Sequence, residues 1–179
     1  VVHPAPGNWQ GTLVHGLLYR FPSLKGVGDI SRPGIVHRLD GSTSGLMAVA
    51  KDQEALEHLQ EQFARREVTK IYIALVRGGM KSAAGTIDAP IGRSPTNRLQ
   101  MAVVDGGRAA VTNYRRLWTK NGFSLLECEI PTGRTHQIRV HLAAIGRPII
   151  GDILYGAGRD GGLPEGRIFL HSWRLSFVF

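Results

Sequence analysis

The chain has 179 residues, a formal net charge of +8 and a sequence pI of about 10.2. A hydrophobic content of 42% and a mean hydropathy of −0.08 exclude a disordered tail, and no apolar run approaches the ~20 residues that a membrane-spanning helix needs. The single cysteine, Cys128, excludes an internal disulfide framework and a zinc site built from several cysteines.

The N-terminal third is expected to hold two helices joined by a loop and a short strand. Residues 10–21 repeat apolar side chains at the helix period. The loop SRPGIVHRLDGSTSG follows, and residues 46–50, LMAVA, are typical of a short buried strand. Asp52 is a suitable N-cap for the next helix, whose apolar stripe contains Leu56, Leu59 and Phe63.

The middle of the chain is expected to be sheet. Residues 69–78, TKIYIALVRG, are apolar on both alternations, as in a central strand. Turn residues separate further strand patterns in GTIDAPI, LQMAVV, AAVTNYRRLW and FSLLECEI. Residues 135–145 return to helix, with Thr135 as the cap, Gly146 as the stop, and Ile138, Leu142 and Ile145 facing inward. The pattern predicts a mixed α+β fold dominated by sheet.

The two ends and the charge add two expectations. The start, VVHPAPGN, has no positively charged segment before an apolar stretch, so no signal peptide is visible, and the end, RIFLHSWRLSFVF, stops within a strand pattern. We therefore expect a piece of a longer protein. The basic balance favours a polyanion as partner, nucleic acid first, although many basic proteins bind nothing specific.

The first candidate site is GIVHRLDGSTSG, residues 34–45. Arg38 and Asp40 lie two residues apart in this Gly- and Ser-rich loop, and a partly desolvated carboxylate kept ionised by a cation is a good base or nucleophile. The alternative is a loop aspartate that forms a turn with Gly41 and Ser42. The spacing alone favours the turn.

The second candidate site is PTGRTHQIRVHLAAIG, residues 131–146. Arg134 lies where a turn enters a helix, and a helix N-terminus attracts a phosphate or a carboxylate. Arg139 would extend a basic face along the helix. An ordinary capped helix with solvated arginines explains the segment equally well.

Metal and cofactor chemistry finds no support in the motifs. His136 and His141 are five residues apart, which does not match the i, i+4 pair of a helical metal site. Neither GxGxxG nor GxxxxGK occurs, and Ser42 and Ser44 lack the context of a nucleophile elbow. We expect no metal and no cofactor, which leaves a carboxylate, arginines and a tyrosine.

The motifs together resemble those of the RluA-type RNA pseudouridine synthases. HRLDGSTSGLMAVAK, residues 37–51, is similar to the family signature, TKIYIALVRG to its second motif, and GRTHQIRVHLAAIGRPIIGD, residues 133–152, to its third. The opening HPAPGNWQGTLVHGLL is similar to the family segment after its first core strand. The matches occur in family order over nearly the whole chain, and His37 favours the RluA-type branch over RsuA-type relatives.

The resemblance implies a pseudouridine synthase catalytic fold. This is an α+β architecture, with a mixed and mainly antiparallel sheet and with flanking helices and loops around a central RNA-binding cleft. Residues 1–179 would form one catalytic domain that lacks the family's first and last strands, with no S4-type domain in this chain.

The resemblance also implies isomerisation of uridine in RNA, in which the N-glycosidic bond breaks and the base rejoins the ribose through C5. The implied substrate is large-subunit ribosomal RNA, with a tRNA as the alternative. The implied protein is a bacterial-type cytoplasmic monomer that needs no cofactor. Two other hypotheses stay open: a catalytically silent RNA-binding domain, and an aspartate-dependent hydrolase, which the lack of paired carboxylates weakens.

Finally, the resemblance implies roles for individual residues. Asp40 would be the essential aspartate, attacking the ribose or the base or taking the C2′ proton. Tyr72 would stack on the target base or help to remove the C5 proton, and Arg134 would pair with the aspartate. Arg38 would fill the space that a flipped base leaves. The candidate RNA-contacting set also contains His37, Thr43, Arg32, Arg65, Arg66, Lys70, Arg98 and Arg139, although each basic residue taken alone is more typical of a solvated surface charge.

Overall fold

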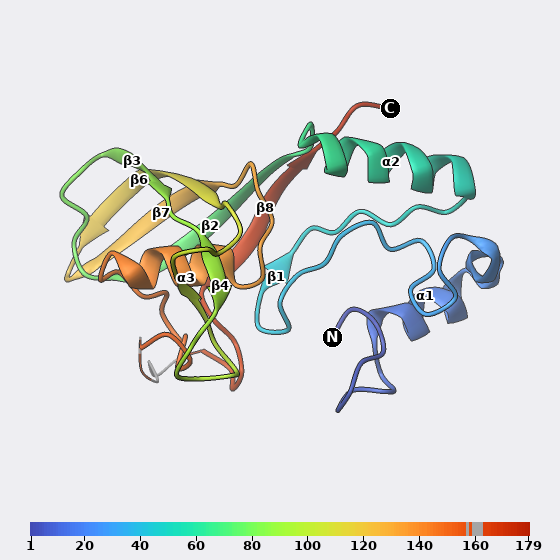
Figure 1. The fold of residues 1–179 in the computed structure, drawn as a ribbon, viewed down its shortest axis with the longest axis horizontal. Helices are drawn as coiled ribbons and strands as arrows, with labels where there is room; N and C mark the ends of the chain where they lie inside the picture. Colours follow the sequence, from blue (N-terminus) through green and yellow to red (C-terminus); the bar gives the residue numbers. More distant parts are fainter. Residues whose placement is uncertain (157, 159–162) are drawn as a thin grey trace. The chain divides into compact units, whose positions relative to one another are not determined.

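A computed structural model describes residues 1–156, 158 and 163–179 (Figure 1). The backbone divides into two compact units. The first contains Val1–Gly41, Leu46–Val68 and Leu175–Phe179, and the second contains Ser42–Gly45 and Thr69–Arg174. The prediction of one catalytic domain over residues 1–179 stays a prediction.

The first unit is helical. It holds helix α1 (Leu13–Arg20), the 3-10 helix η1 (Pro22–Gly26) and helix α2 (Gln53–Arg65), which agrees with the periodicity of the sequence. The Asp52 carboxylate accepts a hydrogen bond from the Ala55 N–H at 2.8 Å, so the predicted N-cap is confirmed. The core of this unit consists of Leu24, Val27, Ala50, Leu56 and Leu59.

The predicted strand over residues 46–50 is wrong. This segment makes one isolated bridge, Ile35 to Val49, and its backbone bonds go to residues 34–37 rather than to a sheet. The strand lies just before it, as β1 (Ser44–Gly45), which pairs in parallel with His171 and Ser172. Gly45 has a φ of 115° there, and a Cβ atom at this position would collide with the Ser172 main chain, so only glycine fits.

The second unit is built on a six-stranded sheet with the strand order β1-β8-β2-β7-β6-β3 (Figure 1). The β2/β7, β7/β6 and β6/β3 pairs are antiparallel, so the predicted α+β fold with a mainly antiparallel sheet is confirmed. A second sheet pairs β4 (Ile91–Arg93) with β5 (Met101–Val103). The other bounds are β2 (Thr69–Arg77), β3 (Ala84–Asp88), β6 (Val111–Lys120), β7 (Phe123–Glu129) and β8 (Leu170–Ser176).

Strand β7 shows why the sheet forms where it does. Ser124, Leu126 and Cys128 alternate along the strand and are fully buried, so the strand expected in FSLLECEI packs this face into the core. Burial raises the pKa of the Cys128 thiol to about 12. The thiol is therefore protonated at neutral pH, as expected for a core residue.

Helix α3 (Gln137–Ala144) begins later than predicted. Its N-cap is His136, which adopts the left-handed φ of 57°, and not Thr135. Ile138 and Leu142 are buried as expected, whereas Ile145 is exposed because it is the C-cap, beyond the last helical turn. Gly146, with a φ of 70°, ends the helix as predicted. Among the described residues, no helix is long and apolar enough to cross a membrane.

Candidate functional site

His37 anchors the HRLD segment within the first unit. The Ala48 N–H donates a hydrogen bond of 2.9 Å to His37 Nε2, and the imidazole stacks on Phe63 with 4.8 Å between the ring centroids. Because a backbone N–H only donates, Nε2 is the unprotonated nitrogen. Arg38 is exposed and Asp40 is half-buried. Both charged residues therefore lie within three residues of an imidazole that is held in place.

Residues 43–45 belong to the second unit. The Ser44 hydroxyl lies 2.8 Å from His171 Nδ1, where β1 runs beside β8. The Thr43 hydroxyl oxygen is buried and has no hydrogen-bond partner in the described part of the chain. A buried hydroxyl left unpaired costs about 1–3 kcal/mol, so a polar group that reached it would be favoured.

Tyr72 and Lys70 lie on one face of β2. Alternate residues of a strand point to the same side, and these two are 8% and 9% exposed, followed on that face by the buried Ala74 and Val76. Tyr72 is opposite Cys128 in the register with β7. The central strand of the sheet therefore holds both side chains in a largely dry environment.

Arg134 is held by the turn that leads into α3. Its main-chain N–H donates to Gln137 Oε1 at 3.0 Å, and its Nε donates to the Ala109 carbonyl oxygen at 3.0 Å. The residue is half-buried. Both the backbone and the guanidinium of Arg134 are therefore tied to neighbouring parts of the second unit.

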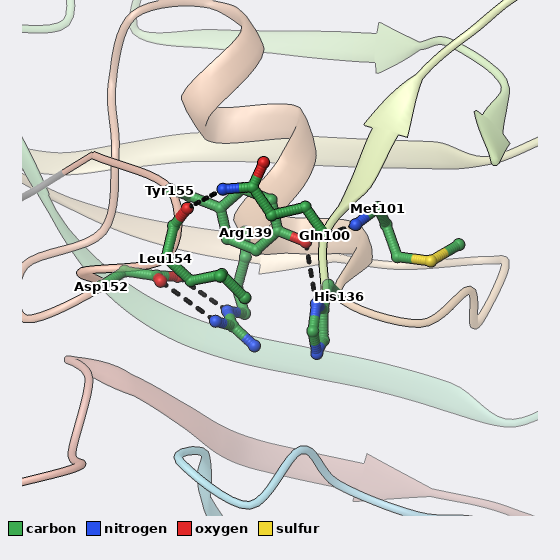
Figure 2. A network of polar contacts seen from close by, with 7 residues as sticks. All are labelled: Gln100, Met101, His136, Arg139, Asp152, Leu154 and Tyr155. Atoms are coloured by element: carbon green, nitrogen blue, oxygen red, sulfur yellow. Dashed lines mark hydrogen bonds and ion pairs between the residues drawn. The ribbon is translucent and has the colours of Figure 1, made fainter. Parts of the chain in front are cut away.

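A buried ion pair lies behind this turn. Arg139 donates through Nε to Asp152 Oδ2 at 2.7 Å and through Nη2 to Oδ1 at 3.0 Å (Figure 2). The two side chains are only 7% and 1% exposed. The guanidinium also lies over the Tyr155 ring, 5.0 Å from its centroid. The predicted exposed basic face at Arg139 is wrong, because its guanidinium points into the protein toward Asp152.

The Tyr155 hydroxyl extends this network to β5 and to the start of α3. It accepts a hydrogen bond from the Met101 N–H at 2.9 Å and lies 2.8 Å from His136 Nδ1 (Figure 2). Gln100 Nε2 donates to the Leu154 carbonyl oxygen in the same place. A left-handed φ at a non-glycine residue costs about 1–3 kcal/mol, and this contact offsets part of that cost at His136.

The other predicted RNA-contacting arginines are on the surface. Arg32 lies 3.7 Å from Asp29, and Arg65 lies 2.5 Å from Glu61, in pairs whose side chains are all at least half exposed. Such exposed pairs contribute little and leave the guanidinium able to exchange partners. Arg66 and Arg98 are exposed as well.

The histidines of the second unit do not gather with acidic residues. Among the described residues, no group of three or more His, Cys, Asp and Glu side chains is arranged to hold a metal ion. His141 is fully buried, and its ring bonds to Thr112 Oγ1 at 2.9 Å and to the Ala89 carbonyl oxygen at 3.0 Å. Burial lowers the pKa of this imidazole. His141 therefore serves the packing of α3.

Residues 23–144 match the family model described as RNA pseudouridylate synthase. This range is more than half of the chain, and it includes Asp40, Tyr72 and Arg134. The chain belongs to the RNA pseudouridylate synthase family.

Curated relatives of this family match nearly the whole chain. An uncharacterized RNA pseudouridine synthase from Chloroflexus aurantiacus is 54% identical over 178 residues, which cover 99% of this chain and 55% of the relative. The ribosomal large subunit pseudouridine synthase D of Nitrosomonas europaea is 47% identical over 184 residues, 99% of this chain and 52% of the relative. The chain thus spans about half the length of the curated relatives it matches.

A solved structure of the family has a similar fold. Human RNA pseudouridylate synthase domain containing 1 is 34% identical, with a TM-score of 0.76. The match covers 92% of this chain and 68% of the human chain. The α+β architecture is therefore that of an RNA pseudouridylate synthase.

Sequence reasoning missed the residues that support this family's third motif here. Gln137, Asp152 and Tyr155 make the contacts that hold Arg134, Arg139 and His136, and none of them was predicted as a site residue. The available signal was that all three are polar residues inside or just after that motif; in the structure, Gln137 lies on the buried stretch 137–142 of α3. Buried polar side chains need partners, so such residues are candidates for structural networks.

Proposed function

We propose that this chain is the catalytic part of an RNA pseudouridine synthase that converts uridine to pseudouridine. The observation that carries the proposal is the family match, because it spans the HRLD segment, the tyrosine strand and the arginine turn in one alignment. In this reaction the bond between N1 and C1′ breaks, a bond between C5 and C1′ forms, C5 loses a proton and N1 gains one. The atoms of uridine are conserved, so no oxidant or group donor is needed.

Asp40, Tyr72 and Arg134 carry the reaction in this proposal. Asp40 is the essential residue, as attacking group on the ribose or the base or as base for the C2′ proton. Tyr72 stacks on the uracil, and its place on the central strand β2, opposite Cys128, supports a fixed position for the ring. Arg134 stabilises the carboxylate, because a planar guanidinium matches its two oxygens.

Arg38 assists by filling the space of the flipped uridine, which costs a few kcal/mol to unstack. Its exposed side chain beside the anchored His37 supports this role. Phosphate and sugar contacts are proposed for the remaining basic and polar residues, and Arg139 is assigned to internal support because of its pair with Asp152. The proposed contacts are His37, Thr43, Arg32, Arg65, Arg66, Lys70 and Arg98.

The proposed substrate is large-subunit ribosomal RNA, in a protein that acts as a cytoplasmic monomer without metal or cofactor. The support is that several similar proteins, such as those of Nitrosomonas europaea and Zymomonas mobilis, are named ribosomal large subunit pseudouridine synthase D. A tRNA is the alternative substrate. The net charge of +8 suits either polyanion.

The test is tritium release from RNA labelled at uracil C5, with ribosomal RNA and tRNA transcripts in parallel. We expect release from ribosomal RNA by the wild-type chain and none by Asp40→Asn. Asp105→Asn, which removes an exposed carboxylate in a turn, is the matched control and should release label like the wild type. Binding of both RNAs without any release would instead support a silent RNA-binding domain.

A further inference from the structure

The Gln137 side chain lies at the centre of a buried hydrogen-bond network in the second unit. It is only 3% exposed, and its amide makes hydrogen bonds at both ends. We propose that Gln137 is the positioning residue of Arg134: it fixes the turn from which the Arg134 guanidinium extends. The proposal rests on the function proposed above for Arg134.

The oxygen end of the amide holds the turn. Gln137 Oε1 accepts the Arg134 N–H at 3.0 Å and the Thr132 hydroxyl at 2.8 Å. In return, the Gln137 N–H donates to the Arg134 carbonyl oxygen at 3.1 Å. The Gln137 side chain thus reaches back three residues to a main-chain N–H, as a Gln does in a capping box, although the N-cap of α3 is His136 and Gln137 is the first helical residue. Gln137 therefore ties the turn that contains Arg134 to the first residue of the helix.

The nitrogen end of the amide ties the same turn to β6. Gln137 Nε2 donates to the Val111 carbonyl oxygen at 2.8 Å and to Thr112 Oγ1 at 3.2 Å. Thr132 Oγ1 in turn accepts the Val111 N–H at 2.9 Å. The amide can accept at one end and donate at the other, whereas the ionised carboxylate of a glutamate at this position would only accept.

His141 closes the network from behind and fixes its proton order. Because the Ala89 carbonyl oxygen can only accept, His141 Nε2, 3.0 Å away, carries the ring proton and donates it there. Nδ1 of the neutral ring then accepts the hydrogen of the Thr112 hydroxyl at 2.9 Å, and Thr112 Oγ1 in turn accepts from Gln137. Thr112 and His141 are both fully buried, so the amide of Gln137 has no freedom to turn over.

The same end of β6 also receives the guanidinium. Arg134 Nε donates to the Ala109 carbonyl oxygen, two residues before Val111. Residues 109–112 thus hold Arg134 in two ways. The guanidinium bonds directly to Ala109, and the main chain is linked to Val111 and Thr112 through the Gln137 side chain. Displacement of this stretch or of the turn moves the guanidinium, and a misplacement of about 1 Å at a reacting group can lower a rate about 100-fold.

The experiment compares Gln137→Met with Gln62→Met. Methionine keeps the length of the side chain and removes its hydrogen bonds. Gln62 is a matched control, because it is also buried and also bonds main-chain groups, those of Val178 at 2.9 and 2.6 Å. At a temperature where both variants are folded, we expect kcat for tritium release to fall roughly 10- to 100-fold in Gln137→Met, with KM for RNA within about threefold of wild type. Gln62→Met should keep the wild-type kcat.

A double-mutant cycle separates positioning from general support. If Gln137 acts through Arg134, its substitution should lower kcat by less than about threefold in an Arg134→Lys background. An equal loss in both backgrounds, or a wild-type kcat in Gln137→Met, would overturn the proposal. Thr132→Val, which removes the second donor to Oε1 and the acceptor of the Val111 N–H but keeps the Gln137 amide, is the milder variant if Gln137→Met does not fold.

Hydrogen exchange tests the contact without any substrate. The Arg134 amide should exchange faster in Gln137→Met than in wild type or Gln62→Met, because its acceptor is gone. Unchanged exchange at this amide would reject the positioning role. A wild-type chain that releases no tritium would instead reject the proposed function, and the exchange result would stand by itself.

Discussion

The Arg38 side chain is exposed, whereas the side chain of the preceding residue, His37, is held in place. His37 is held by the Ala48 N–H and by stacking on Phe63, so an alanine at position 38 removes a side chain without removing an anchor. We predict that Arg38→Ala keeps the unfolding transition of wild type and lowers kcat/KM for RNA roughly 10- to 100-fold, because the flipped state loses a few kcal/mol of support. Tritium release at limiting RNA measures the effect.

Arg66→Ala is the control for Arg38→Ala, since it also removes an exposed arginine of the first unit. It should weaken binding modestly, as one phosphate contact among several. Turnover at the wild-type level in Arg38→Ala would remove Arg38 from the flipping role.

At the level of elements, the Arg139–Asp152 pair joins α3 to the segment that follows it. Both side chains are almost completely buried, and the hydrogen bonds are bidentate. Asp152→Asn leaves a buried guanidinium with a neutral partner, so we predict a loss of roughly 3–5 kcal/mol in the free energy of unfolding. Urea unfolding followed by circular dichroism measures it.

Glu61→Gln provides the contrast, because it breaks the exposed pair with Arg65 on α2. Its loss should be about 0.5 kcal/mol or less. Similar losses in the two variants would show that burial does not distinguish these ion pairs.

Helix α3 also marks the limit of prediction at this scale. Its apolar stripe and its Gly146 stop were readable, because they follow from the helix period and from a positive φ. Its start was not, because the N-cap is His136 in a left-handed conformation and not Thr135, and the turn before it is held by the Gln137 side chain. The polar residues Gln137, Arg139 and His141 are typical of a solvated face, yet all are buried through partners far away in the sequence.

Similar reasoning explains the other elements. Helix α2, its Asp52 cap and the strand in FSLLECEI depend on local sequence pattern and were predicted correctly. The strand expected over residues 46–50 failed because pairing depends on which segment lies alongside, and β8, which pairs with β1, is more than a hundred residues away. The motif positions Asp40, Tyr72 and Arg134 were identified by resemblance. The residues that support the third motif could not be predicted, because their contacts join parts of the chain that only folding brings together.

For the whole molecule, two histidines with lowered pKa values set a stability that depends on pH. The pKa values of His141 and His3 are lowered from 6.5, in both cases mainly by burial, so the folded chain binds protons less readily than the unfolded chain. The resulting stability is present above pH 6.5 and is lost as the pH falls through the folded-state values. We predict that the free energy of unfolding falls between about pH 7 and pH 5, and that His141→Gln makes this slope shallower.

Urea unfolding at intervals across that range measures the slope. This window is chosen because histidine is the side chain whose ordinary pKa lies within it. A free energy of unfolding that stays constant from about pH 7 to pH 5 would contradict the assignment of a neutral buried His141.

Charge and composition indicated a polyanionic partner, and the family match connects that partner to one reaction on RNA. The most direct measurement is the identity of the product nucleoside after the chain acts on large-subunit ribosomal RNA, by digestion and liquid chromatography with mass spectrometry. We predict pseudouridine with the mass of uridine and an altered retention time, absent with Asp40→Asn and present with Asp105→Asn. Free uracil and an abasic ribose would instead reveal a hydrolase and contradict the account.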